Sequence, residues 1–307
     1  MATAFYSHTD CLLHEMGEDH PEAPARLLAI EDQLIASRID TLLEHVSPPL
    51  ADEAALLRVH TQAHLDYLLT HAPVSGYASI DADTRMNPHT WRAALRAAGA
   101  ALAATDAVLA GHYDNAFCSV RPPGHHAEPA RAMGFCFFNN VALAARHALD
   151  VHGLQRVAIV DFDVHHGNGT EAAFAGDPRV LMCSFFQHPF FPFTGVDHQA
   201  PNMVNIPLEA RAKGMVVREA ADQMWLPRLR AFKPEMIFIS AGFDAHREDD
   251  LGNMSLVEND FIWLTEQVQQ IAKRYASGRI VSCLEGGYNL SALGRSVVAH
   301  VRTLAGL

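Results

Sequence analysis

The chain has 307 residues, of which 49% are hydrophobic and 19% are charged, and these proportions exclude an intrinsically disordered protein. The formal net charge of −12 at pH 7 argues against a nucleic-acid-binding protein, because such proteins present a basic surface. No apolar run approaches the roughly 18 residues that cross a bilayer, so we expect neither a membrane-spanning segment nor a membrane partner.

The N-terminus and the cysteines both favour a cytoplasmic protein. The first ten residues, MATAFYSHTD, lack the basic and apolar stretches of a secretory signal. The cysteines are odd in number, scattered and without a Cys-x-x-Cys pair; they are Cys11, Cys118, Cys136, Cys183 and Cys283. We therefore expect buried, reduced thiols rather than disulfides or a zinc–cysteine site.

In chain order, the first ninety residues predict helices and loops, with a helix over residues 25–35, and an alanine-rich helix over residues 91–109 follows. Strands and helices then alternate. We expect strands at 116–120, 157–162, 180–185, 236–240 and 280–284, and helices at 140–150, 170–174, 215–232, 260–275 and 293–304. This alternation predicts an α/β fold with a doubly wound, mostly parallel sheet flanked by helices. No repeat or linker divides the chain, so we expect one domain over residues 1–307.

Polar clusters follow five of the predicted strands immediately. They are residues 121–126, 161–170, 184–195, 241–246 and 285–288. In open α/β sheets, ligands bind beyond the carboxyl ends of the strands. The sequence therefore predicts an active site along this edge, whereas the loop over residues 73–83 has no assigned role.

The densest cluster is the segment DFDVH, residues 161–165, directly after an apolar run. Alternate side chains of an extended segment point the same way, so its two carboxylates and its imidazole can converge. Buried carboxylates are costly unless a cation lies between them. Asp163, His165 and Asp244 would make three ligands with open positions, which is typical of a catalytic metal site. Oxygen and nitrogen ligands without cysteine favour zinc, with Fe(II), Co(II) or Mn(II) as alternatives.

Such a metal would polarise a carbonyl oxygen and lower the pKa of a bound water. Attack on an amide also needs a base and an acid, for which His125 and His126 are candidates. Tyr288 could donate a hydrogen bond to the developing oxyanion. Each residue has a simpler interpretation: a polar turn for the two histidines, a helix cap for Asp244, and a cover over the sheet end for Tyr288. The placement of all these residues at strand ends favours the functional interpretation over the simpler ones.

Most of the nineteen histidines are not expected to act in chemistry. Six lie in polar or helical contexts without metal-ligand spacing: His45, His71, His112, His147, His152 and His300. For a lone histidine of this kind a structural role is the better prediction.

Taken together and in order, the motifs resemble the histone deacetylase superfamily, within the arginase–deacetylase fold. The resemblance rests on residues 121–127 (RPPGHHA), 134–140 (GFCFFNN), 161–170 (DFDVHHGNGT), 241–244 (AGFD) and 285–288 (EGGY). Residues 20–27 (HPEAPARL) resemble the family's first active-site loop. Asn168 stands where class I enzymes carry Asp, so the chain is more similar to class II enzymes and to bacterial deacetylase-like amidohydrolases.

The resemblance implies a role for each polar residue of the edge. Asp163, His165 and Asp244 would hold one Zn²⁺. His126 would act as general base and then acid, with His125, backed by Asp161, as its electrostatic partner. Because its partner Asn168 is neutral, His126 lacks a carboxylate that would raise its pKa, which suits a base near a cation.

The resemblance also implies a substrate tunnel and a second ion. Gly134, Phe135 and Phe191 would line the tunnel around an acyl-lysine stem. A K⁺ ion would bind backbone oxygens of Asp161, Asp163 and His165 together with Ser184.

The implied activity is a zinc-dependent amidohydrolase that removes acetyl or related acyl groups from lysine side chains of a protein or peptide. Leu251, in the stretch EDDLGNM (residues 248–254), resembles the gate residue of the lysine deacetylases. The neighbouring Asp249 and Asp250 keep an N-acetylpolyamine amidohydrolase open as the alternative, with an acetylated small amine as substrate.

Two further alternatives are weaker. A ureohydrolase of the same fold needs extra carboxylates for two Mn²⁺ ions, but Gly167 and His246 stand two residues past His165 and Asp244. A non-catalytic acyl-lysine binding module is disfavoured because Tyr288 and the other expected catalytic residues are present. The sequence does not predict an oligomeric state.

Overall fold

The computed structural model describes residues 2–197 and 199–307. Within that part of the chain, one sheet has eight strands in the order β2-β1-β5-β10-β9-β6-β7-β8, and every pairing in it is parallel. The strands are β1 (Thr3–Tyr6), β2 (Glu44–Val46), β5 (Asn115–Cys118), β6 (Val157–Asp161), β7 (Val180–Gln187), β8 (Met203–Leu208), β9 (Met236–Ala241) and β10 (Ile280–Leu284). The predicted α/β class and sheet type are confirmed.

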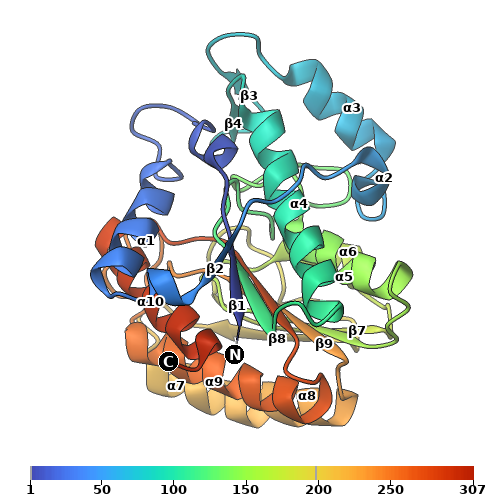
Figure 1. The fold of residues 1–307 in the computed structure, drawn as a ribbon, viewed down its shortest axis with the longest axis vertical. Coiled ribbons are helices and arrows are strands. Elements are labelled where there is room, and N and C mark those ends of the chain that lie inside the picture. Colours follow the sequence, from blue (N-terminus) through green and yellow to red (C-terminus); the bar gives the residue numbers. More distant parts are fainter. Residues whose placement is uncertain (1, 198) are drawn as a thin grey trace.

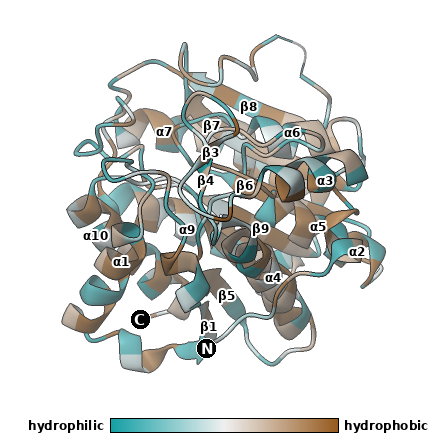
Figure 2. Ribbon diagram, turned by 90° about the horizontal axis from the view of Figure 1, so that it is seen from above, coloured by the Kyte–Doolittle hydropathy of each residue, from teal (hydrophilic) through white to brown (hydrophobic). Residues whose placement is uncertain are grey.

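Helices cover both faces of this sheet (Figures 1 and 2). On one side lie α2 (Glu53–Leu56), α3 (Gln62–His71), α4 (Thr90–Leu109), α5 (Asn140–Asp150) and α6 (Asn168–Phe174). On the other lie α1 (Ala25–Ala36), α7 (Gly214–Ala220), α8 (Leu226–Phe232), α9 (Glu258–Tyr275) and α10 (Leu290–Ala305). A short antiparallel pair, β3 (Ala78–Ser79) and β4 (Arg85–Met86), lies above the edge where the parallel strands end. None of the described helices combines the length and apolarity that a membrane crossing requires.

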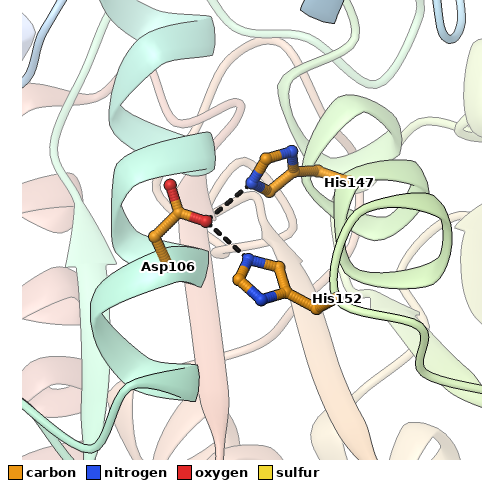
Figure 3. Close-up of side chains that lie close together, drawn as sticks. All are labelled: Asp106, His147 and His152. Carbon is orange, nitrogen blue, oxygen red and sulfur yellow. Dashed lines mark hydrogen bonds and ion pairs between the residues drawn. The ribbon is translucent and has the colours of Figure 1, made fainter.

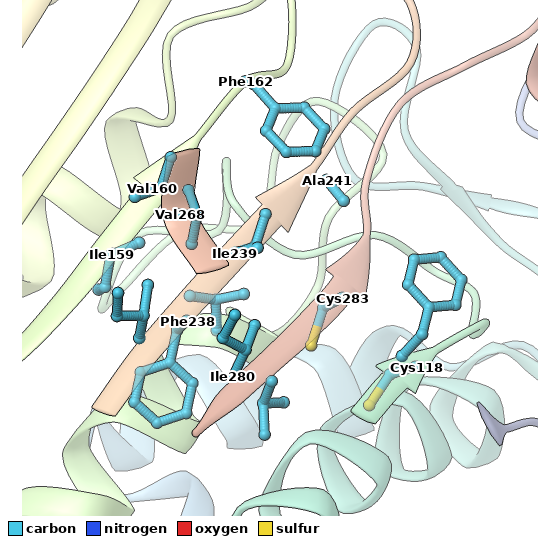
Figure 4. Close-up of a cluster of buried hydrophobic side chains, with 14 of the residues drawn as sticks. Cys118, Ile159, Val160, Phe162, Phe238, Ile239, Ala241, Val268, Ile280 and Cys283 are labelled. Atoms are coloured by element: carbon cyan, nitrogen blue, oxygen red, sulfur yellow. The ribbon is translucent and has the colours of Figure 1, made fainter. Parts of the chain in front are cut away.

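The central strands are buried on both faces, which explains their unbroken apolar runs. Every residue of β6, β9 and β10 is buried. Figure 4 shows part of this core, in which Val160, Phe162, Ile239 and Val268 belong to one cluster of buried side chains. All five cysteines are free and buried, as expected. A rigid core of this kind holds the strand ends in fixed positions.

The sequence analysis missed β1 and the strands at the two edges of the sheet; β1 and β2 lie in the first ninety residues, for which helices and loops were predicted. Strand β1 is only four residues long, which is too short to give a clear periodicity. The edge strand β2 has two exposed residues in three and carries little apolar signal. The other edge strand, β8, contains Pro207, which argues against a central strand but is tolerated at an edge, where no partner needs its N–H. The predicted helix over residues 215–232 is also interrupted, by a π-helical turn over Ala221–Trp225. Pro227 follows this turn, in the first turn of α8. Its ring disfavours a regular α-helix through the preceding residues.

Candidate active site

Three of the predicted metal ligands converge where β6 and β9 end. The Nδ1 atom of His165 lies 3.0 Å from Oδ1 of Asp163 and 3.2 Å from Oδ2 of Asp244. All three ligand atoms lie within 4.8 Å of one another. The strand register brings them together, because β6 and β9 are hydrogen-bonded neighbours that end side by side.

Backbone amides orient both carboxylates of this cluster. Gly286 N donates to Oδ2 of Asp163 at 2.9 Å, and Val164 N donates to Oδ1 of Asp244 at 2.9 Å. The other oxygen of Asp244 is buried; among the described residues it makes no hydrogen bond of regular geometry and faces only Nδ1 of His165, at 3.2 Å. One imidazole between two buried carboxylates leaves negative charge uncompensated, so the cluster fits a cation at this point.

The pKa values of the cluster indicate the same need for positive charge. Burial and the nearby Asp163 charge raise the pKa of Asp244 to about 7. Although burial opposes it, contacts with Asp163 and Asp244 raise the pKa of His165 to about 10. In the absence of a metal the imidazole thus supplies the positive charge between two carboxylates. A divalent ion would supply it better and return His165 to its neutral, ligating form.

The two predicted catalytic histidines are buried side by side, with ring centroids 4.0 Å apart. Nδ1 of His125 lies 3.0 Å from Oδ2 of Asp161, and Nδ1 of His126 lies 2.8 Å from Oδ1 of Asn168. Burial lowers the pKa of His125, but the carboxylates of Asp163 and Asp161 outweigh this effect and hold that pKa well above its usual value. Burial, with the charges of His125 and His165, holds the pKa of His126 well below it.

Asn168 also determines which nitrogen of His126 is free. The amide nitrogen of Asn168 donates to Oε1 of Glu128 at 2.8 Å, so its carbonyl oxygen faces the imidazole. That oxygen can only accept, and Nδ1 of His126 must therefore carry the proton. Nε2 is left with a lone pair, which is the form that a general base needs.

A cavity of about 320 Å³ opens above these residues. It is lined by Asp83, His126, Gly134, Phe135, His165, Phe190, Phe191, Asp250, Leu251, Asn253 and Tyr288. All the residues predicted to bind substrate are in its wall. Gly134 has φ of +55°, and a Cβ atom there would lie 2.5 Å from the ring of His126, so only glycine fits.

The cavity contains residues that sequence reasoning did not assign. Phe190 stacks on the ring of His165, with centroids 5.3 Å apart at 18°. Asp83 brings the unassigned loop over residues 73–83 to the cavity wall. Phe190 lies in the strand-end cluster over residues 184–195 but was given no role of its own. Asp83 had no signal, because it lies between β3 and β4, follows none of the predicted strands and reaches the site through tertiary packing.

A buried charge network supports the loop that carries Tyr288. Arg26 donates from Nε to the carbonyl of Gly287 at 2.7 Å and from Nη2 to that of Glu285 at 2.5 Å. Glu22 accepts from both Arg26 and Arg121, and all three side chains are fully buried. The Arg26 guanidinium also lies 4.9 Å from the ring centre of Tyr288. The network thus fixes both the backbone and the ring.

The side chains of Asp249 and Asp250 lie in different environments, although the sequence analysis gave both residues the same possible role. Asp249 is buried, and its Oδ2 accepts from the backbone amides of Tyr288 at 2.6 Å and Asn289 at 2.9 Å. Its Oδ1 accepts from the amide of Leu251 at 3.0 Å. Asp249 therefore ties the gate residue to the tyrosine loop, and only Asp250 is in the cavity wall.

Comparisons with known proteins agree with this geometry. A model of the histone deacetylase domain matches residues 20–304. The chain is 35% identical to a histone deacetylase-like amidohydrolase of Pseudomonas aeruginosa, over 99% of this chain and 86% of that protein. It is 37% identical to the human polyamine deacetylase HDAC10, over 100% of this chain but only 48% of that protein. The crystal structure of the HDA15 HD domain superposes with a TM-score of 0.93 at 34% identity, covering 99% of this chain and 90% of that one.

Proposed function

This chain belongs to the histone deacetylase family, and from that premise we propose that it is a zinc-dependent amidohydrolase that removes acetyl or related acyl groups from lysine side chains. Residues 1–307 would form its one catalytic domain. The observation that carries the proposal is the cluster of Asp163, His165 and Asp244 beside a cavity of about 320 Å³ whose wall includes Phe135, Phe190 and Phe191. Apolar walls of this kind would pack against the hydrocarbon stem of an acylated lysine.

Asp163, His165 and Asp244 would hold the zinc ion. When bound, zinc polarises the amide carbonyl and acidifies a water molecule. Nε2 of His126, with its lone pair, would take a proton from the attacking water and later give it to the leaving amine. His125, kept cationic by Asp161 and Asp163, would hold positive charge beside the reacting centre throughout.

Tyr288 would stabilise the oxyanion that forms from the carbonyl. Tyr288 is part of the cavity wall, and its loop is held by Arg26 and Asp249. A donor that is already oriented needs no reorganisation during the reaction, which makes its hydrogen bond more effective than one from water.

We also propose the K⁺ ion beside the zinc site, at backbone oxygens of Asp161, Asp163 and His165 with Ser184. Ser184 pairs with Asp161 in the register of β6 and β7, so the proposed ligands are adjacent in space. This supports the assignment, which a titration of activity with KCl against NaCl would test.

An acetylpolyamine amidohydrolase is the second candidate, because Asp83 and Asp250 put two carboxylates in the cavity wall. Carboxylates in that position would attract the secondary ammonium groups of a polyamine. Leu251, in the same wall, favours acyl-lysine instead.

A substrate panel tests the proposal and separates the two candidates. The zinc-loaded protein would be assayed for kcat/KM with acetyl-lysine peptides, longer acyl-lysines and N-acetylspermidine. We expect the highest value for an acyl-lysine peptide. Asp244→Ala, purified in parallel, controls for contaminating deacetylases. Preference for N-acetylspermidine would favour the second candidate, and turnover of none of these amides would contradict the enzyme assignment.

A further inference from the structure

A second group of possible metal ligands lies on the surface between α4 and the end of α5 (Figure 3). Asp106 comes from α4, His147 from the last turn of α5, and His152 from the turn that follows. Oδ1 of Asp106 lies 2.6 Å from Nε2 of His147 and 2.6 Å from Nε2 of His152. We propose that these three side chains form a site for a divalent transition metal, of which zinc is the expected ion.

The end of α5 explains why His147 and His152 meet. The helix ends at Asp150, and the amides of Val151 and His152 both donate back to the carbonyl of His147, at 2.9 and 3.4 Å. The chain therefore folds back on itself, and the two rings lie with centroids 5.2 Å apart. The carboxyl end of a helix is also the end that favours a bound cation.

The ligand set suits zinc. Two imidazole nitrogens and one carboxylate oxygen leave a fourth position for water, and the same set accepts Co²⁺, Ni²⁺ and Cu²⁺. Ligand atoms at tetrahedral zinc lie about 3.3 Å apart, for bonds of about 2.0 to 2.1 Å. The side chains of Asp106, His147 and His152 are 54%, 12% and 31% exposed, so they can separate by the fraction of an ångström that this requires.

Arg58 sets the strength of this site. Its Nη1 lies 3.3 Å from Nδ1 of His147. A guanidinium can only donate, so in the metal-free form Nδ1 accepts and Nε2 carries the proton toward Asp106. A metal at Nε2 requires the proton on Nδ1, where it would face the Arg58 donor. Metal binding therefore makes Arg58 turn away, and an acceptor in its place would strengthen binding.

The site differs from the proposed catalytic one in position and role. It lies outside the described cavity walls, at the turn that leads from α5 into β6, the strand that ends at Asp161. A bound ion would join α4 to this turn. We therefore expect it to affect thermal stability and to leave turnover unchanged.

The test is a count of bound metal on the full chain. Protein dialysed against micromolar Zn²⁺ would be analysed by inductively coupled plasma mass spectrometry, and the affinity of the weaker site would be measured in competition with a chromophoric chelator. We expect two equivalents for the wild type and one for His152→Ala and for Asp106→Asn. His112→Ala, which alters an exposed histidine outside the cluster, is the matched control and should retain two.

Arg58→Gln removes the donor that faces Nδ1 of His147 and should tighten the weaker site about tenfold, at the low end of the range for groups that surround metal ligands. In an Asp244→Ala background, which isolates this site from the catalytic one, His152→Ala should reduce binding from one equivalent to none. Equal metal content in the wild type, His152→Ala and Asp106→Asn would overturn the proposal. Failure of the catalytic assignment would instead appear as two equivalents of zinc, rather than one, in Asp244→Ala itself.

Discussion

The two clusters of metal-ligating side chains in this chain use the same residue types but differ in their surroundings. In the strand-end cluster Asp163 and Asp244 are buried, backbone amides orient them, and the single imidazole of His165 lies between the two carboxylates. In the helix-end cluster Asp106 is half-exposed, and both imidazoles contact its Oδ1. Burial therefore leaves the first cluster dependent on a cation, whereas hydrogen bonds satisfy the second in the absence of one.

The largest expected effect is the loss of the strand-end metal. Asp244→Ala removes a buried ligand that no neighbouring side chain can replace, so zinc at this site and deacetylase activity should disappear together. Metal analysis beside an acetyl-lysine assay checks this. Full zinc occupancy in the variant would show that Asp244 is not a ligand.

The next effect separates the two groups that act beside the metal. Removing an oxyanion donor typically costs about 10²–10³ in kcat, and removing a general base about 10²–10⁴. Tyr288→Phe and His126→Ala should therefore both be slow while retaining zinc and fold. On trifluoroacetyl-lysine the defect of Tyr288→Phe should shrink more than the defect of His126→Ala. The activated carbonyl of this substrate depends less on the tyrosine hydroxyl, whereas the attacking water still needs a base. Equal rescue of both variants would contradict these roles.

The third prediction concerns pH. His126 acts as a base only while neutral, and that form is lost as pH falls through its pKa. Asn168→Asp would place a carboxylate at Nδ1, stabilise the imidazolium and raise the pKa of His126. The acidic limb of the kcat/KM profile should therefore move to higher pH. An unchanged profile would mean that another group controls this limb.

Substrate choice should respond more weakly. Leu251→Glu adds a carboxylate to a wall that already contains Asp83 and Asp250. The ratio of kcat/KM for N-acetylspermidine to that for acetyl-lysine should rise about twofold to fivefold, as expected for a partly solvated ion pair. Leu251→Gln, of the same size without charge, should change the ratio little, and an equal response of both variants would point to shape rather than charge.

The sequence predicted the strand-end cluster because its ligands are local. Asp163 and His165 lie within four residues of the end of β6, and Asp244 follows β9 directly, so strand geometry alone brings them to one edge. The helix-end cluster was not predictable in this way. His147 and His152 lack metal-ligand spacing, and Asp106 joins them only through the packing of α4 against α5.

The same distinction explains the other residues that the sequence did not assign. Arg26 acts through contacts with Glu285 and Gly287, more than 250 residues away, and Glu22 pairs with Arg26 and with the distant Arg121. Asp249 was expected near the cavity mouth, but its carboxylate turns inward to backbone amides. Long-range contacts of this kind depend on how loops pack against one another, which periodicity and motif spacing do not encode.

The smallest expected effect tests whether the helix-end cluster is a metal site or a structural ion pair. In EDTA, Asp106→Asn should lower the free energy of unfolding by less than about 1 kcal/mol, because exposed ion pairs contribute little and the Asn oxygen can still accept a hydrogen bond. With Zn²⁺ present, the wild type and His112→Ala should gain more stability than Asp106→Asn, which retains only the strand-end site, since an ion that binds only the folded state stabilises it by mass action. Urea titrations in EDTA and in Zn²⁺ would measure both differences, with His112→Ala as the control. A loss of more than about 2 kcal/mol of unfolding free energy by Asp106→Asn in EDTA would exceed what an exposed ion pair contributes. If Zn²⁺ added no further difference between the two proteins, the cluster would have a structural role instead.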